Sequence, residues 1–124
     1  MADIDLTGTW ESMYTYGEGR HSKHVLTVCQ TNNQVAGKSL PQADGSAVTL
    51  ELTFDAQNGV LSGFWRERTA SNGHYHGRVF HGVMQLVVGS EILHGKWAGF
   101  NSAGSHIQTG DWTLRRQQEN GAKK

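Results

Sequence analysis

A glycine-x-tryptophan triplet recurs four times and takes up every tryptophan of the chain: Gly8-Thr9-Trp10, Gly63-Phe64-Trp65, Gly95-Lys96-Trp97 and Gly110-Asp111-Trp112. Residues two apart on a β-strand share a face, so each glycine and its tryptophan point the same way. Four leucines fall on that face too: Leu6, Leu61, Leu93 and Leu114. The repeat therefore predicts strands with one strongly apolar face turned to the inside. Its rings either fill a core or stack on a flat ligand.

Alternation of apolar and polar residues continues along the chain, and no long stretch repeats apolar positions at helical spacing without a glycine interrupting it. Sixteen glycines against one proline favour short strands joined by tight turns, as at Asn32-Asn33 and Gln57-Asn58-Gly59. The pattern predicts eight strands, at about 6–16, 23–31, 34–40, 46–55, 59–69, 74–88, 91–101 and 106–116.

An eight-stranded meander either leaves two exposed edges or closes on itself, and eight strands enclose space for packed side chains or one small ligand. We therefore expect an all-β fold, a closed eight-stranded antiparallel up-and-down barrel. At 124 residues the chain has the size of one domain. We assign the barrel domain to residues 1–116 and a polar frayed tail to residues 117–124.

The charges of the chain are balanced, with 11 Lys and Arg against 11 Asp and Glu, so no net field favours nucleic acid or an anionic membrane. The first residues lack the basic and apolar stretches of a secretory signal, and nowhere do about 18 apolar residues run together. The single cysteine, Cys29, cannot form an internal disulfide, and we expect a buried or half-buried thiol. These features predict a cytoplasmic protein that contacts neither nucleic acid nor membrane directly.

The inward parity, extended beyond the tryptophans, predicts polar and aromatic groups at one end of the barrel. The residues added in this way are Ser12, Tyr14, Tyr16, Glu67, Thr69, Gly99 and Asn101. On the sixth strand, the parity that buries fewer charges places four residues inside: Tyr75, Gly77, Val79 and His81. It leaves His74, His76 and Arg78 in solvent, and a bulge near Gly82 would reverse the choice. An apolar floor below a polar mouth is typical of a ligand-holding barrel.

Glu67 is the most informative of these residues, because an inward carboxylate is costly unless it is paired or hydrogen-bonded. One interpretation is a structural pair with an inward arginine or tyrosine. The other is a ligand acceptor or a general base. The sequence leaves both open.

Other constellations are weaker. His74-x-His76 could place two imidazoles on one strand face, but no carboxylate or cysteine stands at an obvious metal-ligand spacing. No Asn or Asp completes a nucleophilic triad with Cys29 and His24, and the glycine-rich stretch at 17–20 is a turn rather than a phosphate loop. We therefore predict neither a metal nor a cofactor.

Leu6-Thr7-Gly8-Thr9-Trp10 resembles the first strand of calycin barrels, the lipocalin and avidin group. A longer resemblance, from about Thr7 to Arg116, is to the β-rich C-terminal domain of actinobacterial, and thus bacterial, helix-turn-helix proteins. It is carried by Gly8-Thr9-Trp10, Gly37-Lys38-Ser39-Leu40-Pro41, Trp65-Arg66-Glu67-Arg68-Thr69, Phe80-His81-Gly82, Gly95-Lys96-Trp97-Ala98-Gly99-Phe100 and Thr109-Gly110-Asp111-Trp112. The resemblance implies a sensory or effector-binding barrel. This sequence departs from that arrangement because it begins at the barrel, without the DNA-reading helix, which puts the implied regulatory output in doubt.

We expect a non-enzymatic sensor or carrier that holds a flat or hydrophobic small-molecule ligand in a tryptophan-lined lumen. The expected ligand-binding residues are Trp10, Tyr14, Tyr16, Trp65, Glu67, Tyr75, His81, Trp97, Asn101 and Trp112. One alternative is a barrel enzyme of cyclase or isomerase type, with Glu67 as general base and Tyr14, Tyr75 or His81 as the orienting acid. Another is a protein-interaction module, for example a homo-oligomer, that acts through outward Phe64 and Phe100 on the outer surface.

Overall fold

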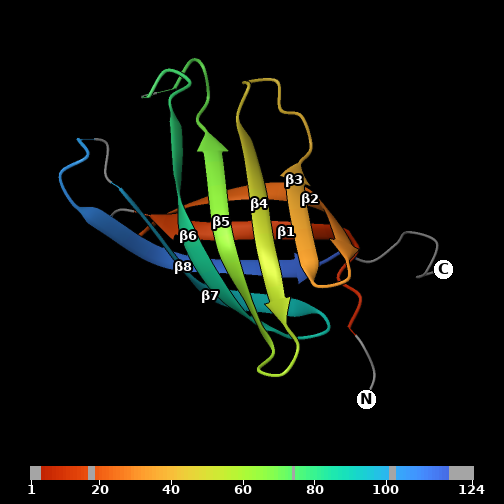
Figure 1. Ribbon diagram of the computed structural model, residues 1–124. Coiled ribbons are helices and arrows are strands. Elements are labelled where there is room, and N and C mark those ends of the chain that lie inside the picture. Colours follow the sequence, from red (N-terminus) through yellow and green to blue (C-terminus); the bar gives the residue numbers. More distant parts are fainter. Residues whose placement is uncertain (1–3, 17–18, 74, 101–102, 118–124) are drawn as a thin grey trace.

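The computed structural model describes residues 4–16, 19–73, 75–100 and 103–117. Within these residues the protein is all-β, with the strands β1 (Gly8–Tyr16), β2 (Arg20–Thr31), β3 (Gln34–Ser39), β4 (Ala47–Asp55), β5 (Val60–Arg68), β6 (Val79–Val88), β7 (Ile92–Phe100) and β8 (Ile107–Arg116). Each strand pairs antiparallel with its neighbours in sequence, and β1 also pairs with β8, which closes the barrel (Figure 1). The expected fold is confirmed. No helix that could cross a membrane occurs among the described residues.

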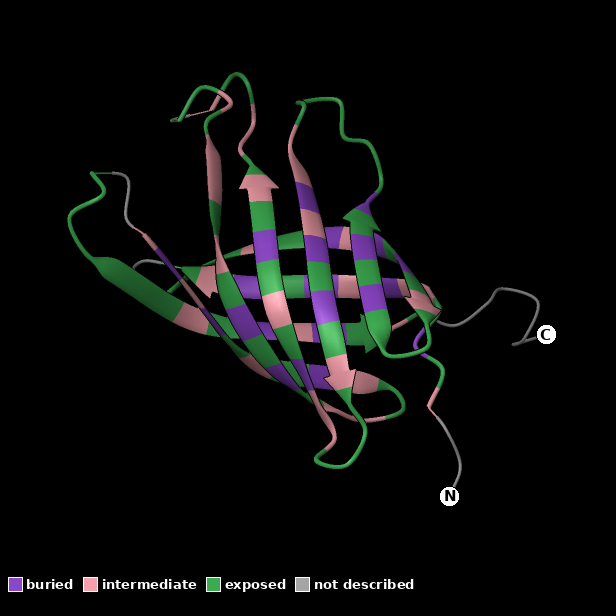
Figure 2. Ribbon diagram, viewed as in Figure 1, coloured by how far each residue is buried: buried purple, intermediate pink, exposed green. Residues whose placement is uncertain are grey.

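The alternation of side chains along each strand separates the core from the surface. On β1, Trp10, Ser12 and Tyr14 are buried, whereas Met13 between them is exposed. Figure 2 shows the same banding of buried and exposed residues along the other strands. Each buried leucine or valine contributes about 1.5–3 kcal/mol relative to an exposed one, so a shift of register by one residue would forfeit the core.

The base of the barrel is covered by the segment that precedes β1. Leu6 in this segment is fully buried, and its carbonyl oxygen accepts a hydrogen bond from Trp10 Nε1 at 2.8 Å. The Arg116 guanidinium lies 4.4 Å from the centroid of the Trp10 ring and donates to the Asp5 and Thr7 carbonyl oxygens, at 2.8 and 3.2 Å. These contacts fix the segment across the base, so any opening of the barrel lies at the other end.

The loops at the opposite end form the mouth, and two of them are joined by hydrogen bonds. The backbone N–H and the hydroxyl of Ser71, in the β5–β6 loop, both donate to the Asp44 carbonyl oxygen in the β3–β4 loop, at 2.9 and 3.1 Å. The β5–β6 loop is also closed on itself, since Thr69 N donates to the Arg78 carbonyl oxygen at 3.0 Å. These hydrogen bonds therefore hold the β3–β4 and β5–β6 loops together on one side of the mouth.

The start of β6 corrects the prediction for this strand. β6 begins at Val79 rather than at residue 74, because His76 and Gly77 adopt positive φ angles of 52° and 81° that break an extended strand. The inward residues are then Phe80, Gly82, Met84 and Leu86, so the prediction that Val79 and His81 face the lumen is wrong. The reason lies at Gly82, which pairs with Trp65: a Cβ there would lie 2.9 Å from ring carbons of Trp65, so only glycine fits below that ring.

The glycines and tryptophans fit together across strands rather than within one triplet. The Trp65 ring covers Gly82 on β6 and Gly99 on β7, where an added Cβ would lie 2.6 Å from the ring. Three glycines of the triplets, Gly63, Gly95 and Gly110, instead let neighbouring backbones approach: a Cβ at Gly63 would lie 2.8 Å from Leu52 Cα. The repeat thus sets the close spacing of the strands around four large rings.

Cys29 also corrects an expectation, because its side chain is exposed. On β2 the buried positions are His24, Leu26 and Val28, which leaves the odd-numbered Cys29 on the outer face. The predicted tail lies outside the described residues from 118 onward.

Candidate functional site

A cavity of about 710 Å³ lies at the mouth of the barrel. Four aromatic residues from β1, β5, β7 and β8 form its floor: Tyr14, Trp65, Trp97 and Trp112. One wall is aromatic and contains Tyr75, Phe80 and Phe100, whereas β2 and the β3–β4 loop supply a polar wall with Ser22, His24, Asp44 and Ser46. The volume and this mixture of apolar and polar lining suit a small-molecule ligand.

The tryptophans present ring faces and edges to the cavity rather than free hydrogen-bond donors. Trp65 Nε1 donates to the Val83 carbonyl oxygen at 3.1 Å, and Trp97 Nε1 donates to the Thr15 carbonyl oxygen at 2.9 Å. Trp112 Nε1 donates to Ser12 Oγ at 2.7 Å. The Trp65 and Trp97 rings meet edge to face, with centroids 5.5 Å apart. Their orientations are therefore fixed before any ligand arrives.

A hydrogen bond crosses the lumen above the three tryptophans of this floor. The Tyr14 hydroxyl on β1 donates to Glu67 Oε2 on β5 at 2.5 Å, and these two strands lie opposite each other in the closed barrel. Burial raises the pKa of the Glu67 carboxyl, and the hydrogen bond from Tyr14 opposes this rise. Burial and the Glu67 charge both raise the pKa of Tyr14. The structure thus contains the pair with an inward tyrosine that the sequence allowed, while ligand and catalytic roles of Glu67 stay predictions.

His24 also lines the cavity beside Tyr14, although the sequence analysis did not count it among the ligand-binding residues. Its ring stacks against Tyr14, with centroids 6.3 Å apart and planes 5° apart. Its Nδ1 is enclosed and has no partner among the described residues. Burial lowers the pKa of His24, against an opposing effect of Asp44, because a protonated Nδ1 would have no acceptor. The alternation of Ser22, His24 and Leu26 on β2 was the signal that could have revealed it.

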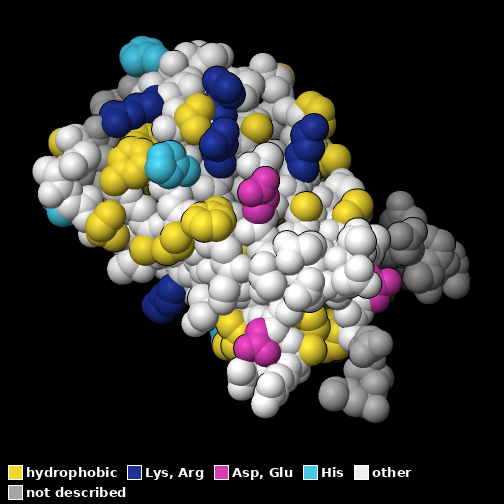
Figure 3. All heavy atoms as spheres, in the orientation of Figure 1, with side chains coloured by type: hydrophobic (Ala, Val, Ile, Leu, Met, Phe, Trp, Pro, Cys, Tyr) yellow, Lys and Arg dark blue, Asp and Glu magenta, His cyan; other side chains and the backbone are white. Residues whose placement is uncertain are grey.

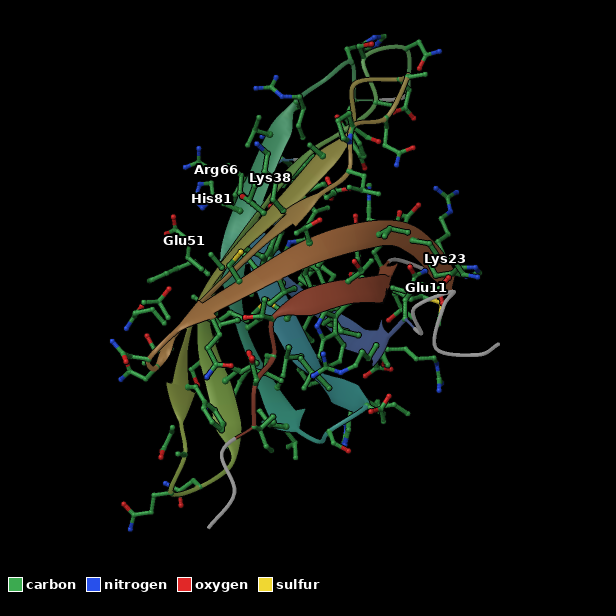
Figure 4. All side chains as sticks on the ribbon, turned by 90° about the vertical axis from the view of Figure 1, so that its right-hand side faces the viewer. Glu11, Lys23, Lys38, Glu51, Arg66 and His81 are labelled. Atoms are coloured by element: carbon green, nitrogen blue, oxygen red, sulfur yellow. The ribbon has the colours of Figure 1, made fainter. Side chains whose placement is uncertain are left out.

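The cavity brings together seven of the ten expected ligand residues: Tyr14, Tyr16, Trp65, Glu67, Tyr75, Trp97 and Trp112. Trp10 does not line the cavity, because it is fully buried at the base. His81 lies on the outer face of the barrel, near Arg66 and Glu51 (Figure 4), and lines a separate surface hollow. Because His81 lies on the outer face and Glu67 lines the cavity, His81 is not placed to act as the orienting acid beside Glu67. Asn101 lies outside the described residues.

The expected outward aromatic pair is not formed. Phe64 on β5 is 63 % exposed, and its neighbour across the strands is Val83 on β6. Phe100 lies one strand further on, and its ring contacts Phe80 and His81 at centroid distances of 5.5 and 5.1 Å. Apolar and basic side chains are interspersed on the face seen in Figure 3. Phe64 and Phe100 therefore do not share one patch.

The structure also does not place the pair of histidines considered as metal ligands, His74 and His76, together on a strand face. His76 lies in the turn before β6 rather than on a strand, and His74 falls outside the described residues. Among the residues that the structure places, no three or more His, Cys, Asp or Glu side chains gather as a metal site.

Replacing Glu67 by glutamine tests the environment of the carboxyl group. The pKa of Glu67 is raised in the folded state, so its contribution to stability is full below the unfolded-state pKa and is lost as pH rises through the folded-state pKa. Glu67→Gln should therefore raise the Tm relative to the wild type more at about pH 7 than at about pH 4. Thermal unfolding at both pH values measures this, with Glu51→Gln on the exposed outer face of β4 as control. An equal effect of Glu67→Gln at both pH values would contradict the assignment.

The site thus combines an aromatic floor, a carboxyl–tyrosine pair and a buried histidine at the open end of a barrel. No protein-family model matches the chain, and the comparison with curated proteins finds no match.

Proposed function

We propose that the protein binds a flat small molecule in the cavity at the mouth of the barrel and acts as a sensor or carrier. The observation that carries this proposal is the floor of the cavity, where Trp65 and Trp97 are locked by bonds from their ring nitrogens to backbone carbonyl oxygens. Rings held in this way offer π faces and edges without losing rotamer entropy on binding. A planar ligand would gain contact area from them at small cost.

The polar groups nearest the tryptophans are well placed to orient such a ligand. Glu67 and Tyr14 stand above the tryptophans, and His24 adjoins Tyr14 on the opposite side. Small-molecule sites usually combine a mainly apolar surface with a few placed polar groups of this kind. The polar wall from β2 and the β3–β4 loop would then face the edge of the ligand.

The architecture agrees with this proposal. A closed eight-stranded antiparallel barrel is the fold of the calycins, and the Gly-x-Trp start of β1 resembles theirs. We propose that the chain is related to these barrels, and through its longer motifs to the C-terminal domain of actinobacterial helix-turn-helix proteins. An effector-binding role would follow from that relationship.

An enzyme of cyclase or isomerase type is the second candidate, and the bond between Tyr14 and Glu67 is the observation that favours it. A carboxyl group and a phenol that share a hydrogen bond inside a cavity could take up and return a proton within one bound substrate. Chemical conversion of a bound compound, abolished in Glu67→Gln, would distinguish this candidate from plain binding.

A variant that fills the cavity tests the proposed function. Ser22→Phe places a ring in the cavity from β2, whereas Thr27→Phe places the same ring on the outer face of the same strand. Riboflavin, adenosine, indole-3-acetate and 8-anilinonaphthalene-1-sulfonate serve as probes, followed by native mass spectrometry and tryptophan fluorescence. We expect at least one probe to bind to the wild type and to Thr27→Phe but not to Ser22→Phe. Binding that persists unchanged in folded Ser22→Phe would contradict the cavity as the site.

A further inference from the structure

Among the described residues, no basic side chain forms an ion pair with Glu67. In the described part of the chain its one polar contact is the Tyr14 hydroxyl, which occupies Oε2 and leaves Oε1 without a donor. The ion pair found among these residues joins Lys96 to Asp111, which lie next to Trp97 and Trp112 in the register of β7 and β8 but on the outer face of the barrel. A partly buried carboxylate ordinarily lies close to a counter-ion or to several hydrogen-bond donors.

Aromatic rings surround this carboxyl group. Phe80 lies directly opposite Glu67 in the register of β5 and β6, and Trp65 lies two residues before it on the same face. Tyr14 supplies a third ring, and Tyr75 packs edge to face on Phe80 with centroids 5.2 Å apart. Aromatic faces attract cations through their quadrupoles, and a carboxylate between them adds a full negative charge. The surroundings of Glu67 thus favour a positive group.

The protein itself shows that this aromatic wall accepts a cation. The Arg78 guanidinium lies 5.0 Å from the centroid of Phe80 and 6.0 Å from that of Phe100, at the mouth. Arg78 is exposed, so its position marks the outer part of the wall. A second flat cation deeper in the cavity would make the same kind of contact and would also reach Glu67.

The remaining charges of the cavity lie at its rim. Arg20 and Asp44 have opposite signs and are both exposed, so solvent and salt screen their fields. Lys23 also borders the cavity, but it belongs to the outward-facing set of β2 and lies near Glu11 on the neighbouring strand (Figure 4). Glu67 is therefore the charged group that a ligand on the tryptophan floor would meet.

We propose that the ligand is a flat organic cation, with an amidinium, guanidinium or primary ammonium group that donates to Glu67 Oε1 while its body rests on Trp65 and Trp97. This inference rests on the proposed function, since it names the class of molecule that the cavity takes. Binding supplies a counter-ion for Glu67, which has none among the described residues. Burial raises the pKa of Glu67, and the cation would lower it again, so a proton leaves the carboxyl group when the cation binds at a pH below the raised pKa.

Three probes of nearly equal shape and different charge test this inference: benzamidinium, benzamide and benzoate. Isothermal titration calorimetry and saturation-transfer NMR give their affinities for the full chain. We expect benzamidinium to bind about tenfold more tightly than benzamide, as a charge-assisted hydrogen bond implies, and benzoate to bind most weakly. Glu67→Gln should remove this preference, and Glu51→Gln, which changes an exposed carboxyl group on the outer face of β4, should keep it.

The pH dependence supplies a second measurement, with a variant that keeps the carboxyl group. The affinity for benzamidinium should rise with pH as Glu67 loses its proton, and the observed heat should depend on the ionisation enthalpy of the buffer. Tyr14→Phe removes the bond that lowers the pKa of Glu67, so the rise should move to higher pH. Circular dichroism confirms that each variant is folded.

The outcomes separate this inference from the proposed function. Equal affinities for benzamidinium and benzamide, both abolished by Ser22→Phe, would overturn the cation proposal and leave the cavity as a binding site. Tighter binding of benzoate would overturn it in the same way. If none of the three probes binds, and those of the wider panel also fail, both proposals are overturned.

Discussion

Trp112→Ala is expected to lower the free energy of unfolding by about 3–5 kcal/mol, the cost typical of removing a buried indole from a packed core. The Trp112 side chain is 1 % exposed and packs against Tyr14 and Trp65, with ring centroids 4.6 and 6.0 Å away. Its loss would open a space inside the barrel and leave Ser12 Oγ without its donor. Because small domains are stable by about 5–15 kcal/mol, much of the total could be lost.

Urea unfolding followed by circular dichroism measures this effect without relying on the lost fluorophore. Trp112→Phe keeps a ring and removes the bond to Ser12, so it should cost less than the alanine variant. Phe64→Ala removes an exposed ring from the outer face and should change stability by about 0.5 kcal/mol or less. A similar loss in Phe64→Ala and Trp112→Ala would contradict the division between core and surface.

Gly95→Ala is expected to destabilise the barrel by about 3 kcal/mol, at the upper end of the range for overpacking. A Cβ at this position would collide with the Gln85 carbonyl oxygen on β6 and would lie 2.8 Å from Leu86 Cα. Both are backbone atoms, which cannot rotate away as the end of a side chain can. Relief requires β6 and β7 to separate, although their pairing helps to close the barrel.

Gly37→Ala is the matched control for this substitution. Gly37 is buried on β3, but a Cβ there would meet only Leu50 side-chain atoms, the nearest at 3.5 Å, which is an ordinary contact. It should be neutral or stabilise slightly, because alanine restricts the unfolded chain. Thermal unfolding of the two variants gives the comparison. Equal losses would show that close packing of β6 on β7 does not limit the residue at Gly95.

The sequence predicted the barrel because its physical signals are local. Alternation of period two determines which side chains of a strand share a face, and Asn and Gly residues mark the turns. On β1 and β5 this alternation placed Tyr14 and Glu67 inside correctly. It failed before β6, where His76 and Gly77 take positive φ angles, because the propensity of a short segment does not reveal such a turn.

The contacts between side chains inside the barrel could not be predicted from the sequence in the same way. Tyr14 and Glu67 are separated by 53 positions, and their bond depends on the stagger and curvature with which eight strands close. The burial of His24 Nδ1, and with it the lowered pKa of that ring, depends on the same packing. Likewise, Trp65 covers glycines from β6 and β7 rather than the glycine of its own triplet.

The sequence by itself determined that this chain forms an eight-stranded barrel with tryptophans inside and polar residues at one end, since hydrophobic periodicity and turn chemistry act over a few residues. The tertiary structure alone decided which of those residues meet. It placed Trp10 at the base, His81 on the outer face, and Tyr14, Glu67 and His24 around one cavity. Closure of the sheet sets these distances, because it brings together strands that are far apart in the chain.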